Sequence, residues 1–123
     1  MLEEASLRIT MMPRDTNVHG TIFGGIILSY IDLAGAVHAR KEGCANVVTV
    51  AMDGVVFHEP VFVGDVVAFR TRTKHLGRSS LRVHVVVEAW RYRDNTQVTV
   101  TEAEVVYVNV DAERRPRPIP RPA

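Results

Sequence analysis

The sequence has a single cysteine, Cys44, among its 123 residues. One thiol excludes an internal disulfide and a cysteine-rich metal site, and it is typical of a protein from a reducing compartment. Long apolar runs are also absent, since no stretch approaches the roughly 18 consecutive apolar residues of a membrane span. The acidic start at residues 1–4 lacks the charged and apolar regions of a signal peptide. We therefore expect a cytoplasmic protein that does not bind membranes.

Net charge of one sign is missing as well. Fifteen basic and fourteen acidic residues give a formal net charge of +1, so no broad basic field indicates nucleic acid as a partner. Lysine is scarce, because Lys41 and Lys74 are the only two and every other basic residue is an arginine. Arginine suits planar, bidentate partners such as carboxylate and phosphate, although a GC-rich genome explains the same bias equally well.

The chain also lacks internal repeats, glycine-serine linkers and low-complexity blocks before residue 113. Its length suits one hydrophobic core, and its 46% apolar and 24% charged residues are typical of a globular protein rather than a disordered one. The tail, ERRPRPIPRPA, has four prolines and four arginines, which predicts an extended, polyproline-like segment. We predict one domain over residues 1–112 and an Arg/Pro-rich tail over residues 113–123.

Residues 24–40 predict one helix, followed by a stop signal at Gly43. Apolar residues occupy every side of its 3.6-residue wheel, which indicates a buried helix with other elements wrapped around it. Strand patterns cover residues 6–11, 47–57, 65–76, 81–89 and 98–110. The order of one strand, one helix and four strands joined by short turns predicts an α+β fold with an antiparallel sheet.

Asp32 is the only acidic residue inside the predicted helix, where it stands between Ile31 and Leu33. An unpaired carboxylate in apolar surroundings is costly, so such a residue persists mainly where it is paired or used. One interpretation is catalysis. The alternative is structural, with Asp32 hydrogen-bonded to a neighbouring backbone group or to Ser29.

Residues 15–25, DTNVHGTIFGG, lead into the helix. Gly24 and Gly25 stand where the helix should begin, so their free backbone N–H groups and the positive end of the helix dipole form a candidate oxyanion hole. The same pair also suits tight packing or a positive φ. Gly25 and Asp32 are separated by two helical turns, roughly 11 Å. They need not serve the same active site.

Other residues are weaker candidates. His19 is one, because an imidazole is a common acid–base group in catalysis, but a hydrogen bond that fixes the loop accounts for this residue too. We place His19 and Phe23 among the residues expected to contact substrate. The remaining histidines lack metal-ligand spacing, so we predict no metal. Ser29 has no recognisable His–Asp partner, which disfavours a serine hydrolase. The turn at His58, Glu59 and Pro60 is assigned a structural role.

The segments NVHGTIFGGIILSYIDLAGA and VVTVAMDGVVFHEPVFVGD, with GRSSL and the Arg/Pro tail, resemble the hotdog-fold acyl-CoA thioesterases. Within that group they are similar to the YciA-like and cytosolic long-chain acyl-CoA hydrolases, over roughly residues 8–120. The resemblance implies an antiparallel sheet wrapped around the central helix. It also implies hydrolysis of fatty acyl-CoA to fatty acid and coenzyme A, with no cofactor besides the coenzyme A of the substrate. Asp32 is then the general base or the nucleophile, and Asn17 positions water or substrate.

The resemblance further implies a dimer with side-by-side sheets, in which Asn17 of one subunit faces Asp32 of the other. Three such dimers would form a hexamer, with a tetramer as the alternative. The phosphates of coenzyme A need cationic and hydroxyl donors, for which the candidates are Arg78, Ser79, Ser80, Arg114, Arg115 and Arg117. A hydratase or dehydratase that uses His19, and a non-catalytic acyl-CoA-binding module, stay open as other functions. The sequence does not determine the acyl chain length.

Overall fold

The computed structural model describes residues 4–121. Its elements follow the predicted order and are β1 (Glu4–Thr10), a 3-10 turn η1 (Pro13–Asp15), α1 (Gly24–Lys41), β2 (Val47–Asp53), β3 (Val66–Leu76), β4 (Ser80–Arg91) and β5 (Thr96–Asn109). One prediction was too long, since the strand expected over residues 47–57 ends at Asp53. Gly54 follows with a φ of +71°, a conformation that turns the chain out of the sheet. Phe57 therefore belongs to a loop.

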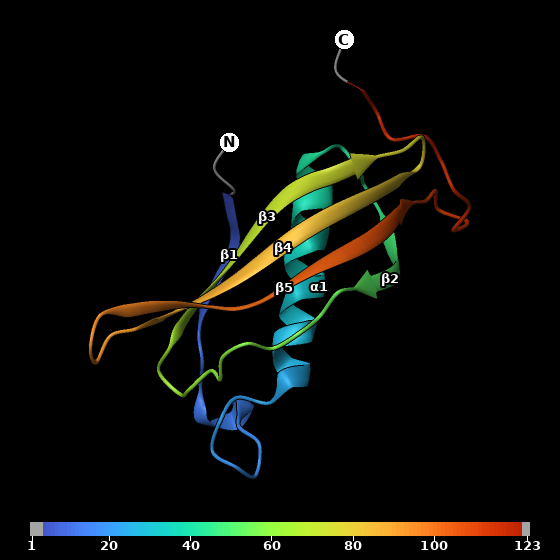
Figure 1. Ribbon diagram of the computed structural model, residues 1–123. Coiled ribbons are helices and arrows are strands. Elements are labelled where there is room, and N and C mark those ends of the chain that lie inside the picture. Colours follow the sequence, from blue (N-terminus) through green and yellow to red (C-terminus); the bar gives the residue numbers. More distant parts are fainter. Residues whose placement is uncertain (1–3, 122–123) are drawn as a thin grey trace.

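The five strands form one sheet in the order β1-β3-β4-β5-β2, and every neighbouring pair is antiparallel. The helix α1 lies across one face of this sheet (Figure 1). β2 is an edge strand, paired only with β5 in the described chain, and its register shifts between Thr49 and Ala51. The α+β architecture predicted from the element order is confirmed.

The core lies between α1 and the sheet. Alternate residues of β4 are buried from Leu81 to Ala89, as the apolar pattern predicted. They face Ile27, Ile31, Ala34, Gly35 and Ala39, the buried residues of the helix. The other side of the helix stays open, and Leu33 is 50% exposed. The expectation of a helix buried on all sides is therefore wrong for a single chain, because one sheet covers only one side of a cylinder.

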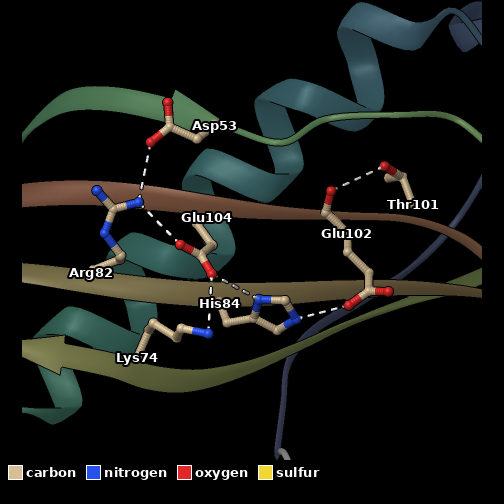
Figure 2. Close-up of polar contacts among 7 residues, drawn as sticks. All are labelled: Asp53, Lys74, Arg82, His84, Thr101, Glu102 and Glu104. Carbon is tan, nitrogen blue, oxygen red and sulfur yellow. Dashed lines mark hydrogen bonds and ion pairs between the residues drawn. The ribbon is translucent and has the colours of Figure 1, made fainter.

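The outer face of the sheet is polar and densely paired (Figure 2). Arg82 donates from Nη1 to Asp53 Oδ2 at 3.1 Å and to Glu104 Oε1 at 3.0 Å. Lys74 Nζ lies 3.5 Å from Glu104 Oε2, and His84 Nε2 is hydrogen-bonded to Glu102 at 2.9 Å. The charged groups come from four adjacent strands, so opposite charges join the strands across this face.

The tail packs onto the domain instead of extending from it. Residues 113–121 contain no helix or strand, although Pro116 forms an isolated bridge with Val110. Ile119 is only 3% exposed and belongs to the core, and its N–H donates to the Arg78 carbonyl at 2.8 Å. Arg121 donates from Nη2 to the Gly77 carbonyl at 2.6 Å. The tail therefore covers the β3–β4 hairpin.

Candidate active site

The start of α1 presents unused hydrogen-bond donors. The helix begins at Gly24, as predicted, and Phe23 precedes it without a capping side-chain hydrogen bond. Within residues 4–121, the N–H groups of Gly24 and Gly25 have no hydrogen-bond acceptor. They lie at the positive end of the helix dipole, where developing negative charge is stabilised. This pair of amides has the chemistry of an oxyanion hole.

An open cavity of about 320 Å³ lies beside the first of these residues, Gly24. Its lining is mostly apolar and comprises Ile22, Gly24, Ile27, Phe57, His58, Glu59, Pro60 and Val61. Sequence reasoning had assigned the turn at His58 and Glu59 to structure alone, whereas the fold places it on the cavity wall. The available signal was two titratable residues directly after the apolar residues Val55, Val56 and Phe57. The cavity suits an acyl group whose polar end meets the helix start.

Phe23 forms a wall next to the helix start. Its side chain is 56% exposed, and a Cβ on Gly25 would lie only 2.5 Å from its ring. The bare backbone of Gly25 therefore lets the ring lie over the first helical turn. The same glycine therefore combines an open amide with an aromatic neighbour.

The side chain of Asn17 closes its own loop. Its Oδ1 accepts hydrogen bonds from the backbone N–H groups of His19 at 2.8 Å and Thr21 at 3.3 Å, and its Nδ2 donates to Thr21 Oγ1 at 3.0 Å. The amide nitrogen carries a second hydrogen that these contacts do not use. The side chain of His19 is exposed and has no hydrogen-bond partner in the described part of the chain. The loop is therefore organised by Asn17 and not by the imidazole.

Asp32 lies half-buried on the helix and is held by a residue that sequence reasoning missed. Thr49, on the edge strand β2, donates from Oγ1 to Asp32 Oδ1 at 2.7 Å. The proposed bond to Ser29 is wrong, since Ser29 donates to the Ile26 carbonyl at 2.7 Å. A hydroxyl within the apolar run VVTVAM was the only sequence signal for Thr49. Asp32 does not line the cavity at Gly24.

The predicted phosphate-binding residues gather at the far end of the molecule. The β3–β4 hairpin with Arg78, Ser79 and Ser80 touches the tail, and Pro120 lies against Gly43 after the C-terminus of α1. Figure 1 shows this end opposite the loop before the helix. Arg115 lies 3.8 Å from Asp111, but Arg78, Arg114 and Arg117 have no acidic partner within the described residues. The structure thus joins these residues to one another, not to Gly24 of the same chain.

Other kinds of function would involve the cysteine, a metal cluster or a membrane-spanning helix. Burial, together with the nearby charge of Glu42, raises the pKa of the Cys44 thiol, so this cysteine is a protonated core residue. Residues 4–121 hold no cluster of three or more His, Cys, Asp or Glu side chains arranged for a metal. In the same range, no helix is long and apolar enough to cross a membrane.

Residues 19–91 match the family model of the thioesterase superfamily. The chain belongs to this superfamily. It is 41% identical over 87 residues to the acyl-CoA thioester hydrolase YciA of Salmonella typhimurium, which covers 71% of this chain and 64% of YciA. It spans 53% of an uncharacterized acyl-CoA thioester hydrolase of Haemophilus influenzae. The chain thus spans between half and two thirds of the curated relatives that it matches.

Solved thioesterase structures confirm the hotdog fold. Cj0915 of Campylobacter jejuni, a hexameric hotdog fold thioesterase, superposes with a TM-score of 0.90 at 45% identity, over 95% of this chain and 90% of that one. An acyl-CoA hydrolase of Staphylococcus aureus, solved with butyryl coenzyme A, gives a TM-score of 0.84 at 30% identity, over 94% and 73%.

Proposed function

We propose that this thioesterase-superfamily chain hydrolyses acyl-CoA to a free acid and coenzyme A. The observation that carries the proposal is the pair of unused amides, Gly24 and Gly25, at the edge of an apolar cavity. A thioester needs both features, because its acyl chain is apolar and its carbonyl oxygen becomes negative in the transition state. The names of YciA and of the Staphylococcus aureus hydrolase agree with this substrate class.

We infer that the active site is shared by two copies of the chain. The edge strand β2 exposes apolar side chains, with Val50 57% exposed, and Leu33 on the adjacent helix is 50% exposed. An apolar edge strand with unpaired backbone groups is a template for pairing with another chain. Asp32 lies on this side through its bond to Thr49, and it is absent from the Gly24 cavity of its own chain. Side-by-side pairing of two sheets would bring Asp32 to the partner's Asn17 and Gly24.

In such a site the Asp32 carboxylate takes a proton from a water molecule while the oxygen of that water adds to the thioester carbonyl carbon. The amides of Gly24 and Gly25 stabilise the oxyanion; donors of this type are worth about 3 kcal/mol. The C–S bond then breaks, and coenzyme A leaves as a thiolate that recovers the proton. Direct attack by Asp32 would give the same products through an anhydride. A positioned base contributes about 10² to 10⁴ in rate.

The arginines at the hairpin and tail are proposed to bind the phosphates of coenzyme A. Arg78, Arg114 and Arg117 are exposed and free of acidic partners among residues 4–121, so their charge is available to an anion. Arg115, Ser79 and Ser80 adjoin them. Because this group is remote from Gly24 of its own chain, it would serve a site formed with a partner. Cj0915 is hexameric, and we propose for this chain a hexamer arranged as three dimers, in the cytoplasm.

A thiol-release assay tests the proposal. Purified protein is incubated with butyryl-, octanoyl- and palmitoyl-CoA and a thiol-reactive dye, with Asp32→Asn as the matched variant. Dye reaction that depends on Asp32 supports hydrolysis. In a separate incubation with a 2-enoyl-CoA, addition of water with loss of the enoyl absorbance would support the hydratase alternative instead, and tight binding of the saturated acyl-CoAs without turnover would support a binding module. Cys44 is buried and therefore contributes little background.

A further inference from the structure

Asp32 has a second hydrogen-bonded contact, which reaches its backbone. Tyr107, in β5, donates its hydroxyl hydrogen to the Asp32 carbonyl at 2.6 Å. The tyrosine side chain is completely buried, at 0% exposure. In a regular helix this carbonyl also accepts the N–H four residues later. The tyrosine is therefore not needed to satisfy the helix backbone, and its bond adds a connection between α1 and the sheet.

The two residues that hold Asp32 are direct neighbours in the sheet. Thr49 in β2 and Tyr107 in β5 are cross-strand partners. Thr49 contacts the carboxylate and Tyr107 contacts the backbone of the same residue. One cross-strand pair thus contacts both the side-chain carboxylate and the backbone carbonyl of Asp32.

The two supports differ in their place in the sheet. Thr49 lies on an edge strand, immediately before the irregular register between Thr49 and Ala51. Tyr107 lies on β5, which is paired with β4 on one side and with β2 on the other. β5 is paired on both sides within a single chain, so displacing it breaks two rows of hydrogen bonds whether or not a second copy is bound. Tyr107 therefore ties the Asp32 turn of the helix to the interior of the sheet.

Gly35 makes room for this contact. A Cβ at Gly35 would lie 2.2 Å from the Tyr107 hydroxyl oxygen and 2.9 Å from two of its ring carbons. A glycine inside a helix costs stability through its backbone entropy. Here it opens a notch through which the hydroxyl reaches the Asp32 carbonyl. Burial, followed by the negative charge of Asp32, raises the pKa of Tyr107 far above its ordinary value, so the hydroxyl keeps its proton and can donate it to the carbonyl.

We propose that Tyr107 is a positioning residue for Asp32 because it holds the helical turn that carries the carboxylate. Gly35 leaves the space that the Tyr107 hydroxyl occupies. The inference rests on the proposed hydrolase function. Small displacements of a reacting group are costly, and an error of 1 Å lowers rates by about a hundredfold. Thr49 orients the carboxylate, whereas Tyr107 sets the position of the main chain from which the carboxylate extends.

The first test replaces the hydroxyl alone. Tyr107→Phe is compared with the wild-type protein and with Tyr30→Phe. Tyr30 lies on α1, the helix that carries Asp32, and its hydroxyl has no hydrogen bond within residues 4–121. We expect Tyr107→Phe to lower kcat by roughly tenfold while KM stays within about twofold. Tyr30→Phe should leave both constants within about twofold of wild type. Circular dichroism and thermal melting establish that each variant is folded at the assay temperature.

The second test distinguishes positioning from general support of the fold. In an Asp32→Asn background, adding Tyr107→Phe should not lower the residual single-turnover rate further, because the hydroxyl acts through the carboxylate. Equal losses in both backgrounds would mean a purely structural tyrosine and overturn the proposal. Gly35→Ala leaves Tyr107 unchanged but pushes its hydroxyl away from the Asp32 carbonyl. This variant should show the same loss of kcat and the same dependence on Asp32.

The two proposals fail in different ways. If the wild-type protein releases no thiol from any acyl-CoA, the proposed function is wrong. If the wild-type protein is active and folded Tyr107→Phe keeps its kcat, the hydrolase stands and only the positioning role is refuted.

Discussion

The two sides of this sheet differ in whether their polar groups are paired within the chain. On the outer face, Arg82, Asp53 and Glu104 satisfy one another across neighbouring strands. On the helix side, the amides of Gly24 and Gly25 have no acceptor in the described chain, and apolar side chains at the β2 edge are exposed. The outer face thus pairs its charges within the chain, whereas the helix side leaves donors open, and under the proposed function a ligand or a second copy completes them.

The largest effect is expected at the half-buried acid. Asp32→Asn should lower turnover by at least roughly a hundredfold, because the amide keeps the size of the side chain but cannot accept a proton. Asp53→Asn is the matched control on the outer face and should leave kcat unchanged. Thiol release under substrate saturation measures both variants. Near-normal turnover in Asp32→Asn would remove this residue from the mechanism and weaken the contrast between the faces.

Subunit mixing tests whether the active site on the helix side contains residues from two copies of the chain. Asn17→Ala and Asp32→Ala proteins, each inactive alone, should regain about a quarter of wild-type activity after exchange, because half of the dimers are mixed and each mixed dimer has one intact site. Mass spectrometry of the exchanged sample verifies that the subunits have mixed. Verified exchange without any recovered activity would contradict the shared site.

A charge on the edge strand should disrupt the proposed dimer. Val50→Lys places an ammonium group in the apolar edge, and lysine is a residue that blocks pairing of edge strands. We expect a smaller species by light scattering, together with loss of most activity. Tyr92→Lys, a similarly exposed site on the β4–β5 hairpin, should retain the assembly. If Val50→Lys keeps the mass of the wild-type assembly, β2 is not the interface.

A smaller effect is expected at the remote arginines. The double variant Arg114→Ala and Arg117→Ala should raise KM for acyl-CoA by about threefold to tenfold at low salt while kcat changes little, because phosphate contacts bind substrate without touching the thioester. The difference should shrink as salt is added. Arg93→Ala, at an exposed arginine of the β4–β5 hairpin, is the control. An unchanged KM in the double variant would exclude the tail from substrate binding.

The smallest effect concerns the outer face itself. Burial alone would raise the pKa of Glu104, but the hydrogen bond from Arg82 and the charge of Lys74 outweigh it, so the net pKa is lowered. A lowered pKa in the folded state stabilises the protein at neutral pH, and this contribution is lost as pH falls through that pKa. Glu104→Gln should therefore melt slightly below wild type at pH 7, with the difference disappearing in acid. Activity at pH 7 should not change; a drop in kcat would mean that the two faces are coupled.

Local patterns predicted much of the architecture and part of the site. The helix start at Gly24, the alternation along β4 and the isolated acid at Asp32 all follow from residues close together in the chain. The partners of Asp32 could not be predicted in this way. Thr49 is 17 residues away and Tyr107 is 75 residues away. Which residues of two strands reach the helix depends on register, and a shift of one residue would turn both side chains to the other face.

Periodicity and the placement of glycines were enough to specify one apolar helix, an antiparallel sheet and an acid within the helix, because each is a property of neighbouring residues. Only the tertiary structure decided that the helix is covered on one side and that His58 and Glu59 line a cavity. It also decided that a facing Thr49–Tyr107 pair holds the acid. The physical reason is that burial, cavities and long-range hydrogen bonds depend on how distant segments pack, and this depends on the whole fold.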